Sequence, residues 1–141
     1  MSEFIQIARD ASLEEVQAIF VDDRFACGLC GCEVLEVAYG RVVCAFDITD
    51  EHLNLSDRVM GGAIFTLADF CLGIVANYNQ PASVSTSCHI EFLAASSGKR
   101  LIATANCDKD GRTLGFYTVV VTDDQGTDIA LMQAVCTRIQ D

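Results

Sequence analysis

Residues 58–69 read Arg-Val-Met-Gly-Gly-Ala-Ile-Phe-Thr-Leu-Ala-Asp, and this stretch decides the fold. It opens an apolar run in which Asp69 is the only charged side chain between Gly61 and Ala76. Because no polar positions recur at helical spacing, the run predicts a helix that is buried on all sides. An ionised carboxylate is costly to bury without hydrogen bonds, so Asp69 is expected to have either a structural partner or a chemical use.

The sequence around this helix predicts one further helix and about six strands. Ser12 and Glu15 have capping-box spacing, so a helix should begin near residue 13 and run into the low twenties. The polar segment 52–60 is expected to be a loop. Strand-like segments cover residues 32–37, 42–48, 82–93, 99–107, 114–122 and 128–139. Short, turn-rich breaks between the last four favour a meander, and the whole order predicts an α+β fold in which an antiparallel sheet curls around one long central apolar helix.

Length and charge restrict the class of protein. The 141 residues fit a single domain, residues 1–141, and the net charge of -11 disfavours nucleic acid and anionic membrane surfaces as partners. No segment is apolar and long enough to span a bilayer, and no basic n-region precedes an apolar h-region, so a cytoplasmic protein is expected. Lys99, Arg100, Lys109 and Arg112 gather in one short window, which is either a solvated hairpin rim or a local anion site.

The eight cysteines do not resemble a disulfide framework. Five occur singly within strand-like or helical apolar segments, as small core residues of a protein in a reducing compartment do. Cys27, Cys30 and Cys32 have a C-x2-C-x-C spacing that could begin a zinc or iron–sulfur site, but no second C-x2-C pair exists. Only His52 and His89 could add imidazole ligands, so no metal is expected, and Cys30 and Cys32 are interpreted as strand-entry residues.

The glycine pair and Asp69 carry the candidate chemistry. N–H groups at a helix N-terminus lack intrahelical acceptors, so Gly61 and Gly62 could donate to a carbonyl oxygen that becomes negative. Asp69 lies eight residues beyond Gly61, about 12 Å along a helix axis, so one substrate cannot contact both groups in one chain. Two antiparallel helices related by a two-fold axis would bring them together. The alternatives are that the glycines only permit tight packing, and that Asp69 caps a loop or pairs with Arg58.

The chain resembles hotdog-fold thioesterases of the PaaI-like, phenylacetyl-CoA thioesterase type. The resemblance covers nearly the whole chain. The matching residues are Asn54, Gly61-Gly62 with Phe65-Thr-Leu-Ala-Asp69, Ile90-Glu-Phe-Leu93, Gly111-Arg112 and Val121-Thr-Asp-Asp-Gln-Gly126.

The resemblance implies an acyl-CoA thioesterase that hydrolyses a thioester to free acid and coenzyme A at a site shared between two subunits. It implies that Asp69 is the nucleophile or general base, that Asn54 helps to hold water or substrate, and that Ser85 contacts the reacting centre. Arg112 matches the element that contacts the coenzyme A phosphates. The resemblance also implies a homodimer or a dimer of dimers, and no cofactor apart from coenzyme A as part of the substrate.

Two features depart from the family pattern. The residue before the glycine pair is often His, whereas here it is Met60, which can pack against an acyl group but cannot orient a carbonyl or carry a proton. The turn after Phe92 lacks the frequent proline. Strict alternation along the third strand predicts two faces. One would carry Ser83, Ser85, Ser87, His89 and Glu91, and the other Val84, Cys88, Ile90 and Phe92.

Other functions remain open at this point. A non-catalytic protein that binds acyl-CoA or acyl-carrier thioesters would also fit a site without the histidine. A dehydratase or hydratase on the same fold would need an acid–base pair, for which Asp69 has no obvious histidine partner. A DNA-binding regulator is disfavoured because no basic patch accompanies the domain.

Overall fold

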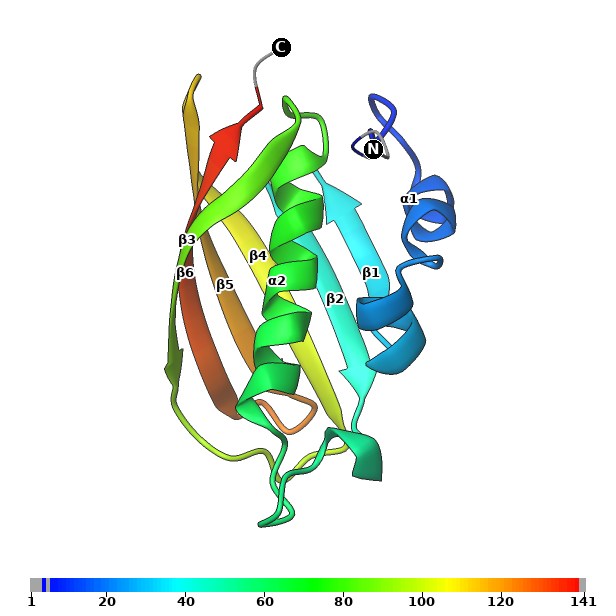
Figure 1. Cartoon of the computed structure of the whole chain (residues 1–141), viewed down its shortest axis with the longest axis vertical. Coiled ribbons are helices and arrows are strands. Elements are labelled where there is room, and N and C mark those ends of the chain that lie inside the picture. The colour runs from blue at the N-terminus through cyan, green and yellow to red at the C-terminus, as the bar shows by residue number, and fades with distance from the viewer. Residues whose placement is uncertain (1–3, 5, 140–141) are drawn as a thin grey trace.

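One long helix held against a curved sheet forms the centre of the molecule (Figure 1). The computed structural model describes residues 4 and 6–139. In chain order the elements are α1 (Leu13–Phe20), the π-helix η1 (Arg24–Leu29), β1 (Glu33–Ala38), β2 (Arg41–Asp47), the 3-10 turn η2 (Asp50–His52), α2 (Gly61–Asn77), β3 (Ser83–Phe92), β4 (Arg100–Asp110), β5 (Leu114–Asp123) and β6 (Asp128–Arg138).

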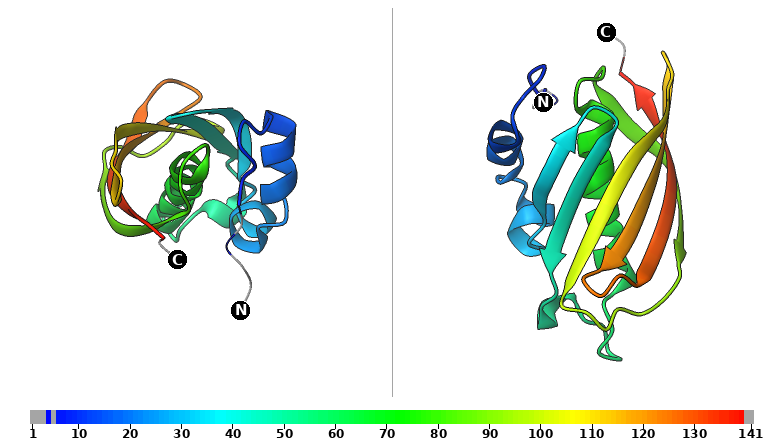
Figure 2. Two further views of the ribbon diagram at one scale, coloured as in Figure 1. Left: turned by 90° about the horizontal axis from the view of Figure 1, so that it is seen from above. Right: turned by 180° about the vertical axis from the view of Figure 1, so that it is seen from behind.

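The six strands form one antiparallel sheet in the order β1-β2-β4-β5-β6-β3. Seen from above, this sheet curves around α2, while α1 lies outside it beside the β1 edge (Figure 2). The Gln17 side chain of α1 donates a hydrogen bond to the Val34 carbonyl oxygen at 2.8 Å. One edge of the sheet is thus joined to a helix, and the opposite edge is β3. The predicted α+β architecture is confirmed.

The predicted meander is correct for β4, β5 and β6 but wrong for β3. β3 pairs with β6, and β4 pairs with β2 on its other side. The reason lies in the path of the chain, because α2 leads it to the far edge of the sheet before β3 begins. Residues 93–99 then cross the lower end of the molecule to reach β4 (Figure 1). The turn residues in this connection signal a reversal, but they do not say which strand comes next in space.

The segment before β1 also differs from the prediction. Cys30 is not a strand-entry residue but the C-cap of η1, whereas Cys32 directly precedes β1. Asp23 caps the start of η1 through its Oδ1, which accepts from the N–H groups of Phe25 and Ala26 at 3.1 and 2.8 Å. The expected loop over residues 52–60 is irregular as predicted, apart from the end of η2.

The helix α2 is buried on most sides but not on all of them. Its inward face packs into the concave side of the sheet, and each large side chain that is fully buried there stabilises the fold by about 1.5–3 kcal/mol. The buried residues are Ile64, Leu67, Ala68, Phe70, Cys71, Leu72, Ile74, Val75 and Ala76. In the single chain Gly62, Asp69 and Gly73 are exposed. The prediction of a helix buried on all sides is therefore wrong for one narrow strip. A hydropathy pattern does not reveal this strip, because two of its exposed residues are glycines and only Asp69 is polar.

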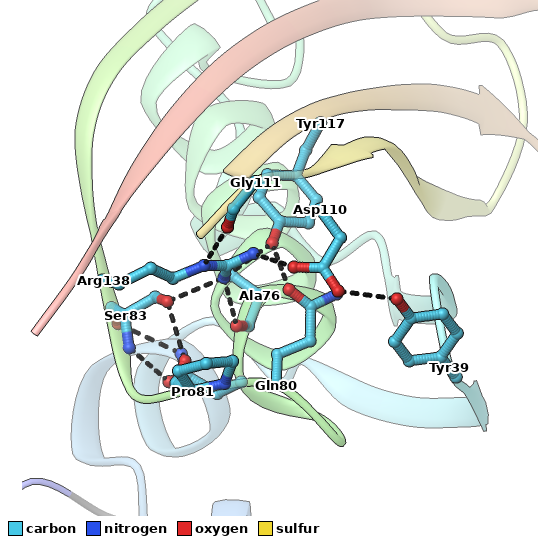
Figure 3. A network of polar contacts seen from close by, with 10 residues as sticks. Tyr39, Ala76, Gln80, Pro81, Ser83, Asp110, Gly111, Tyr117 and Arg138 are labelled. Atoms are coloured by element: carbon cyan, nitrogen blue, oxygen red, sulfur yellow. Dashed lines mark hydrogen bonds and ion pairs between the residues drawn. The ribbon is translucent and has the colours of Figure 1, made fainter. Parts of the chain in front are cut away.

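A buried arginine ties the far end of α2 to the sheet (Figure 3). Arg138 is 4% exposed, and its Nη1 donates to the Ala76 carbonyl oxygen, the Ser83 hydroxyl and the Tyr117 hydroxyl at 3.4, 2.9 and 3.1 Å. Its Nη2 lies 2.5 Å from Asp110 Oδ1, which neutralises the charge. This network joins α2, β3, β4, β5 and β6, so we interpret it as structural.

The cysteines are unpaired and lie mostly in or against the core. All eight cysteine thiols are free. Of the five cysteines expected in the core, Cys44, Cys71 and Cys136 are buried, whereas Cys88 and Cys107 are partly buried. Among residues 4 and 6–139, no group of three or more His, Cys, Asp or Glu side chains is placed to bind a metal ion. None of the helices in this part of the chain is long and apolar enough to cross a membrane.

Candidate active site

The N-terminus of α2 presents free hydrogen-bond donors. Met60 is the N-cap, and its carbonyl oxygen accepts from the N–H groups of Ala63 and Ile64 at 2.9 and 3.2 Å. Within the described part of the chain, the N–H groups of Gly61 and Gly62 have no acceptor. The helix dipole adds partial positive charge at this end. The two N–H groups can therefore donate to an oxygen atom that gains negative charge.

The two glycines differ in their surroundings. A Cβ atom added at Gly61 would lie 3.3 Å from Cζ of Phe92, so the aromatic ring sits directly against the helix entry. A Cβ at Gly62 would meet only the Met60 side chain, at 3.9 Å. The alternative that the glycines only permit tight packing thus accounts for Gly61. It does not account for Gly62, which is exposed.

Asp69 lies two turns further along α2, on its exposed strip. Among the described residues it has no hydrogen bond and no ion pair, so neither a loop cap nor a pair with Arg58 is found there. Although water reaches the carboxylate, the surrounding protein removes part of its solvation. This desolvation, with a smaller contribution from the Asp23 carboxylate, raises the pKa of Asp69 above its ordinary value. A carboxylate with a raised pKa and no internal partner is a candidate base.

The strand β3 brings Ser85 to the same side of the sheet as Asp69. Ser85 lies opposite the buried Cys136 of β6, whose side chain faces α2. Desolvation, the Cys88 thiol and the Asp69 carboxylate raise the pKa of Cys136 to about 11, although Arg138 lowers it. Because its partner Cys136 faces α2, Ser85 lies on the face of the sheet that α2 covers.

The predicted faces of β3 are correct from Ser87 to Phe92 but wrong for Ser83, Val84 and Ser85, because the strand contains a bulge. The register shifts between Ser85 and Ser87, so these two residues do not lie on one face. The outer face carries Val84, Ser87, His89 and Glu91, and the face toward α2 carries Ser83, Ser85, Cys88, Ile90 and Phe92. On the outer face His89 Nε2 lies 2.6 Å from Glu91 Oε1. The expectation that His89 belongs to a polar background face is consistent with this position.

Asn54 is used partly by its own loop. Its Oδ1 accepts from the N–H groups of Ser56 and Arg58 at 2.9 and 3.1 Å. This is the local role that the sequence offers as the alternative to a substrate contact. In the described residues its side-chain NH2 group has no acceptor, so that group can still donate to water or substrate.

The cationic candidates lie apart from the glycine pair. Arg112 is exposed in the turn after β4, next to Gly111, whose carbonyl oxygen accepts from Arg138 Nε at 3.3 Å. Arg138 also contacts Ala76, so this turn lies at the C-terminal end of α2, opposite Gly61. Arg100 is occupied by Glu33 and by Asp47, the latter at 2.6 Å. The structure therefore does not place Arg112 beside the glycine pair of the same chain.

His52 does not take the place of the histidine that is frequent before the glycine pair in the resembled family, where this chain has Met60. The buried imidazole stacks on Phe46 with a centroid distance of 4.1 Å. Its Nδ1 accepts from the Thr49 N–H at 3.0 Å, so Nε2 carries the proton and donates to the Cys30 carbonyl oxygen at 2.8 Å. Both ring nitrogens are engaged in holding η2 to η1. Met60 itself is 54% exposed beside the glycine pair.

Phe92 is a neighbour of the site to which the sequence assigned no role, although the segment 90–93 is part of the family resemblance. Phe92 and Leu93 are both more than half exposed, and the Phe92 ring contacts the position of Gly61. With Met60, Phe92 gives the helix entry an apolar rim. Phe92 is an aromatic residue at the end of the edge strand β3, and a hydropathy pattern does not distinguish such a residue from one in the core.

A cavity of about 520 Å³ lies elsewhere in the molecule, lined by residues that include Tyr39, Asn79 and Gln80. Gln80 accepts from the Tyr117 hydroxyl of the Arg138 network. This cavity therefore sits at the opposite end of α2 from the glycine pair. The candidate site is instead an open surface of the single chain.

Comparison with known proteins identifies the family. The model of the thioesterase superfamily matches residues 57–130, which include the glycine pair, Asp69 and Ser85. The chain is 28% identical over 127 residues to the Escherichia coli acyl-coenzyme A thioesterase PaaI, covering 89% of this chain and 90% of that protein. It is 32% identical over 110 residues to a putative esterase of Deinococcus radiodurans, covering 77% and 75% of the two chains.

A solved structure from Escherichia coli has a similar fold. The structure of the E. coli PaaI protein from the phenylacetic acid degradation operon superimposes with a TM-score of 0.83 at 26% identity, over 92% of this chain and 97% of that one. This likeness confirms the predicted hotdog fold. With the family match over more than half of its length, the chain belongs to the thioesterase superfamily.

Proposed function

We propose that this chain is an acyl-CoA thioesterase with its active site at the interface of a homodimer. The observation that carries the proposal concerns α2. Within residues 4 and 6–139, the N–H groups of Gly61 and Gly62 and the carboxylate of Asp69 have no hydrogen-bond partner, and Gly62 and Asp69 lie on its exposed strip. The relatives named acyl-CoA thioesterases support the same reaction. The donors and the carboxylate are the two groups that thioester hydrolysis needs.

In this reaction the glycine N–H groups of one subunit would bind the thioester carbonyl oxygen. Asp69 of the other subunit would take a proton from water, whose oxygen attacks the carbonyl carbon while the π electrons move to the bound oxygen. The intermediate then expels the coenzyme A thiolate, which takes the proton from Asp69 and leaves a free acid. Direct attack by Asp69, followed by hydrolysis of the anhydride, gives the same products.

Two uncovered surfaces support a dimer. The strip Gly62, Thr66, Asp69 and Gly73 follows helical spacing and consists mostly of small side chains, which would allow a second helix to approach closely. β3 is the edge strand opposite the helix-joined edge, so its backbone groups could pair with a second β3. An antiparallel pair of α2 helices would set Asp69 of each subunit against the partner's glycine pair. A dimer of dimers would extend this assembly.

The other residues take supporting roles in the proposal. Ser85 would contact the reacting centre beside Asp69, and the Asn54 amide would donate to water or substrate. Met60 would pack against the acyl group. Arg112 lies at the C-terminal end of α2, which in an antiparallel pair points toward the N-terminal end of the partner's helix, so it would bind coenzyme A phosphates at the site that contains the partner's glycines. The eight free thiols favour a cytoplasmic location.

Release of free thiol from a panel of short, medium, branched and aromatic acyl-CoAs tests the proposal. The native protein should hydrolyse at least one class, and Asp69→Asn should not, while it remains folded and dimeric by sedimentation. Saturable binding of acyl-CoA without thiol release would favour the non-catalytic binding protein, for which the missing histidine at position 60 is the motivating feature. Equal turnover by Asp69→Asn would remove Asp69 from the mechanism.

A further inference from the structure

The bulge in β3 has one extra residue, and that residue is Thr86. Ser85 lies opposite Cys136 and Ser87 lies opposite Val135, so two residues, Ser85 and Thr86, occupy the space of one. A bulge of this kind re-aims the side chains on one side of it.

The partners of β3 residues on β6 show which side chains face α2. Cys88 and Ile90 face α2, opposite Ala134 and Met132 of β6. Without an extra residue, strict alternation would turn Ser85 to the outer face, together with Ser87. The bulge restores Ser85 to the α2 side, opposite Cys136. The access of Ser85 to the Asp69 side of the sheet therefore depends on the bulge.

The side chain of Thr86 connects the bulge to β6 by hydrogen bonds. Its Oγ1 donates to the Val135 carbonyl oxygen at 3.1 Å and accepts from the Thr137 Oγ1 at 3.2 Å. Val135 and Thr137 flank Cys136, the residue opposite Ser85. The hydroxyl thus holds the strand at both neighbours of that residue, on an exposed edge where the backbone ladder is locally broken.

We propose that Thr86 is a positioning residue for the thioester site, whose hydroxyl fixes the bulge and so turns Ser85 to the face of the sheet that α2 covers. The inference rests on the proposed function of this site. It assigns no contact with substrate to Thr86. Its effect on turnover should pass through Ser85 alone.

A double-mutant cycle separates this role from a general structural one. Thr86→Val removes the hydroxyl and keeps a β-branched side chain in the strand. In the native background it should lower kcat about tenfold with KM changed less than about twofold, because a misplaced group costs rate rather than binding. In the Ser85→Ala background the same substitution should have no further effect on kcat, because the group that it positions is gone. Thr86→Ser keeps the hydroxyl and should retain most of the activity.

The control is Thr104→Val on β4, where Thr104 lies between the buried Ala103 and Ala105 and therefore faces away from α2. This variant should leave kcat unchanged. Sedimentation at the assay concentration should give the same assembly for every variant, since Thr86 lies on the proposed interface strand. An equal loss of kcat from Thr86→Val with and without Ser85, full activity of Thr86→Val, or a changed assembly would overturn the positioning role. A native protein that releases no thiol would instead overturn the proposed function, and the inference with it.

Discussion

Asp69 lies eight residues after Gly61 on α2, so about 12 Å of helix separates its carboxylate from the N–H donor of Gly61, and neither group has a partner in the part of the chain that the structure describes. In the proposed reaction both groups lie about 3 Å from one reacting carbonyl, so a single chain could not use them on one substrate. In that proposal each α2 therefore supplies half of a site.

The pH dependence of turnover should report Asp69. Because desolvation and Asp23 raise its pKa, the carboxylate is protonated at pH values where an ordinary aspartate, with a pKa of about 3.9, is ionised. Activity that needs the ionised form is therefore lost as pH falls through this raised value. Asp23→Asn removes the smaller cause and keeps an oxygen that can accept from Phe25 and Ala26, so it should shift the acidic limb of kcat/KM to lower pH. An acidic limb that is identical in the two proteins would contradict the assignment.

The ring of Phe92 should make the two glycines unequal. An added methyl group at Gly61 would press on Phe92, whereas one at Gly62 would meet only the side chain of Met60. We expect Gly61→Ala to lower kcat several-fold more than Gly62→Ala. Phe92→Leu should recover part of the loss, because it shortens the side chain that the methyl group displaces. Steady-state thiol release from Gly61→Ala, from Gly62→Ala and from the double variant Gly61→Ala/Phe92→Leu measures this. A Gly61→Ala defect that is unchanged in the double variant would disprove the contact's role.

Removing the buried arginine should destabilise the fold strongly. Arg138→Gln leaves Asp110 without its cation and leaves the Ala76 carbonyl, Ser83 and Tyr117 without a shared donor. A loss of about 3 kcal/mol in the free energy of unfolding is expected, as for one partner of a buried pair. Urea denaturation measures it.

The matched control is an exposed pair. Arg41 lies 2.7 Å from Glu36, with side chains that are 51% and 63% exposed. Arg41→Gln should cost less than about 1 kcal/mol, because solvent screens such pairs. Equal losses in the two variants would show that burial of Arg138 adds nothing to its effect.

The turn before β6 should contribute pH-dependent stability through Asp123. The Thr127 N–H at 2.9 Å, helped by the Ser96 hydroxyl and the Gln125 N–H, lowers the pKa of Asp123 even though its burial opposes this. A lowered pKa in the folded state means that the contribution is present above the unfolded value of about 3.9 and is lost as pH falls through the folded value. The difference in unfolding free energy between the native protein and Asp123→Asn should therefore shrink as pH is lowered below about 4. A difference that grows in acid would contradict this sign.

Some elements could be predicted from the sequence because their signals are local. The two glycines and the apolar run place α2 over Gly61–Ala76, one residue short of its observed end at Asn77. Gly40, with a φ of 76°, makes the expected turn between β1 and β2. Turn residues also identify the hairpins of β4, β5 and β6.

Other features depend on information that the local pattern lacks. The pairing of β3 with β6 is decided by the path of the chain around α2, not by the residues of β3. The bulge at Thr86 adds one residue to a period of two, and that reverses every face assignment before it. The exposure of Asp69 depends on where the sheet ends, and a hydropathy pattern does not distinguish solvent from a second copy of the chain.

A mixed dimer tests the shared site most directly. Gly61→Pro removes one N–H donor at the first helical position, where the backbone suits proline because Met60 before it is extended with a ψ of 135°, and its ring also presses on Phe92 as the methyl group of Gly61→Ala does. Asp69→Asn removes the base. Each variant alone should be inactive, but coexpression should restore about a quarter of the native specific activity, because half of the randomly assorted dimers contain one intact site out of two. A coexpressed mixture with no activity, from dimers shown to contain both variants, would contradict a site built from Asp69 of one subunit and the glycine pair of the other.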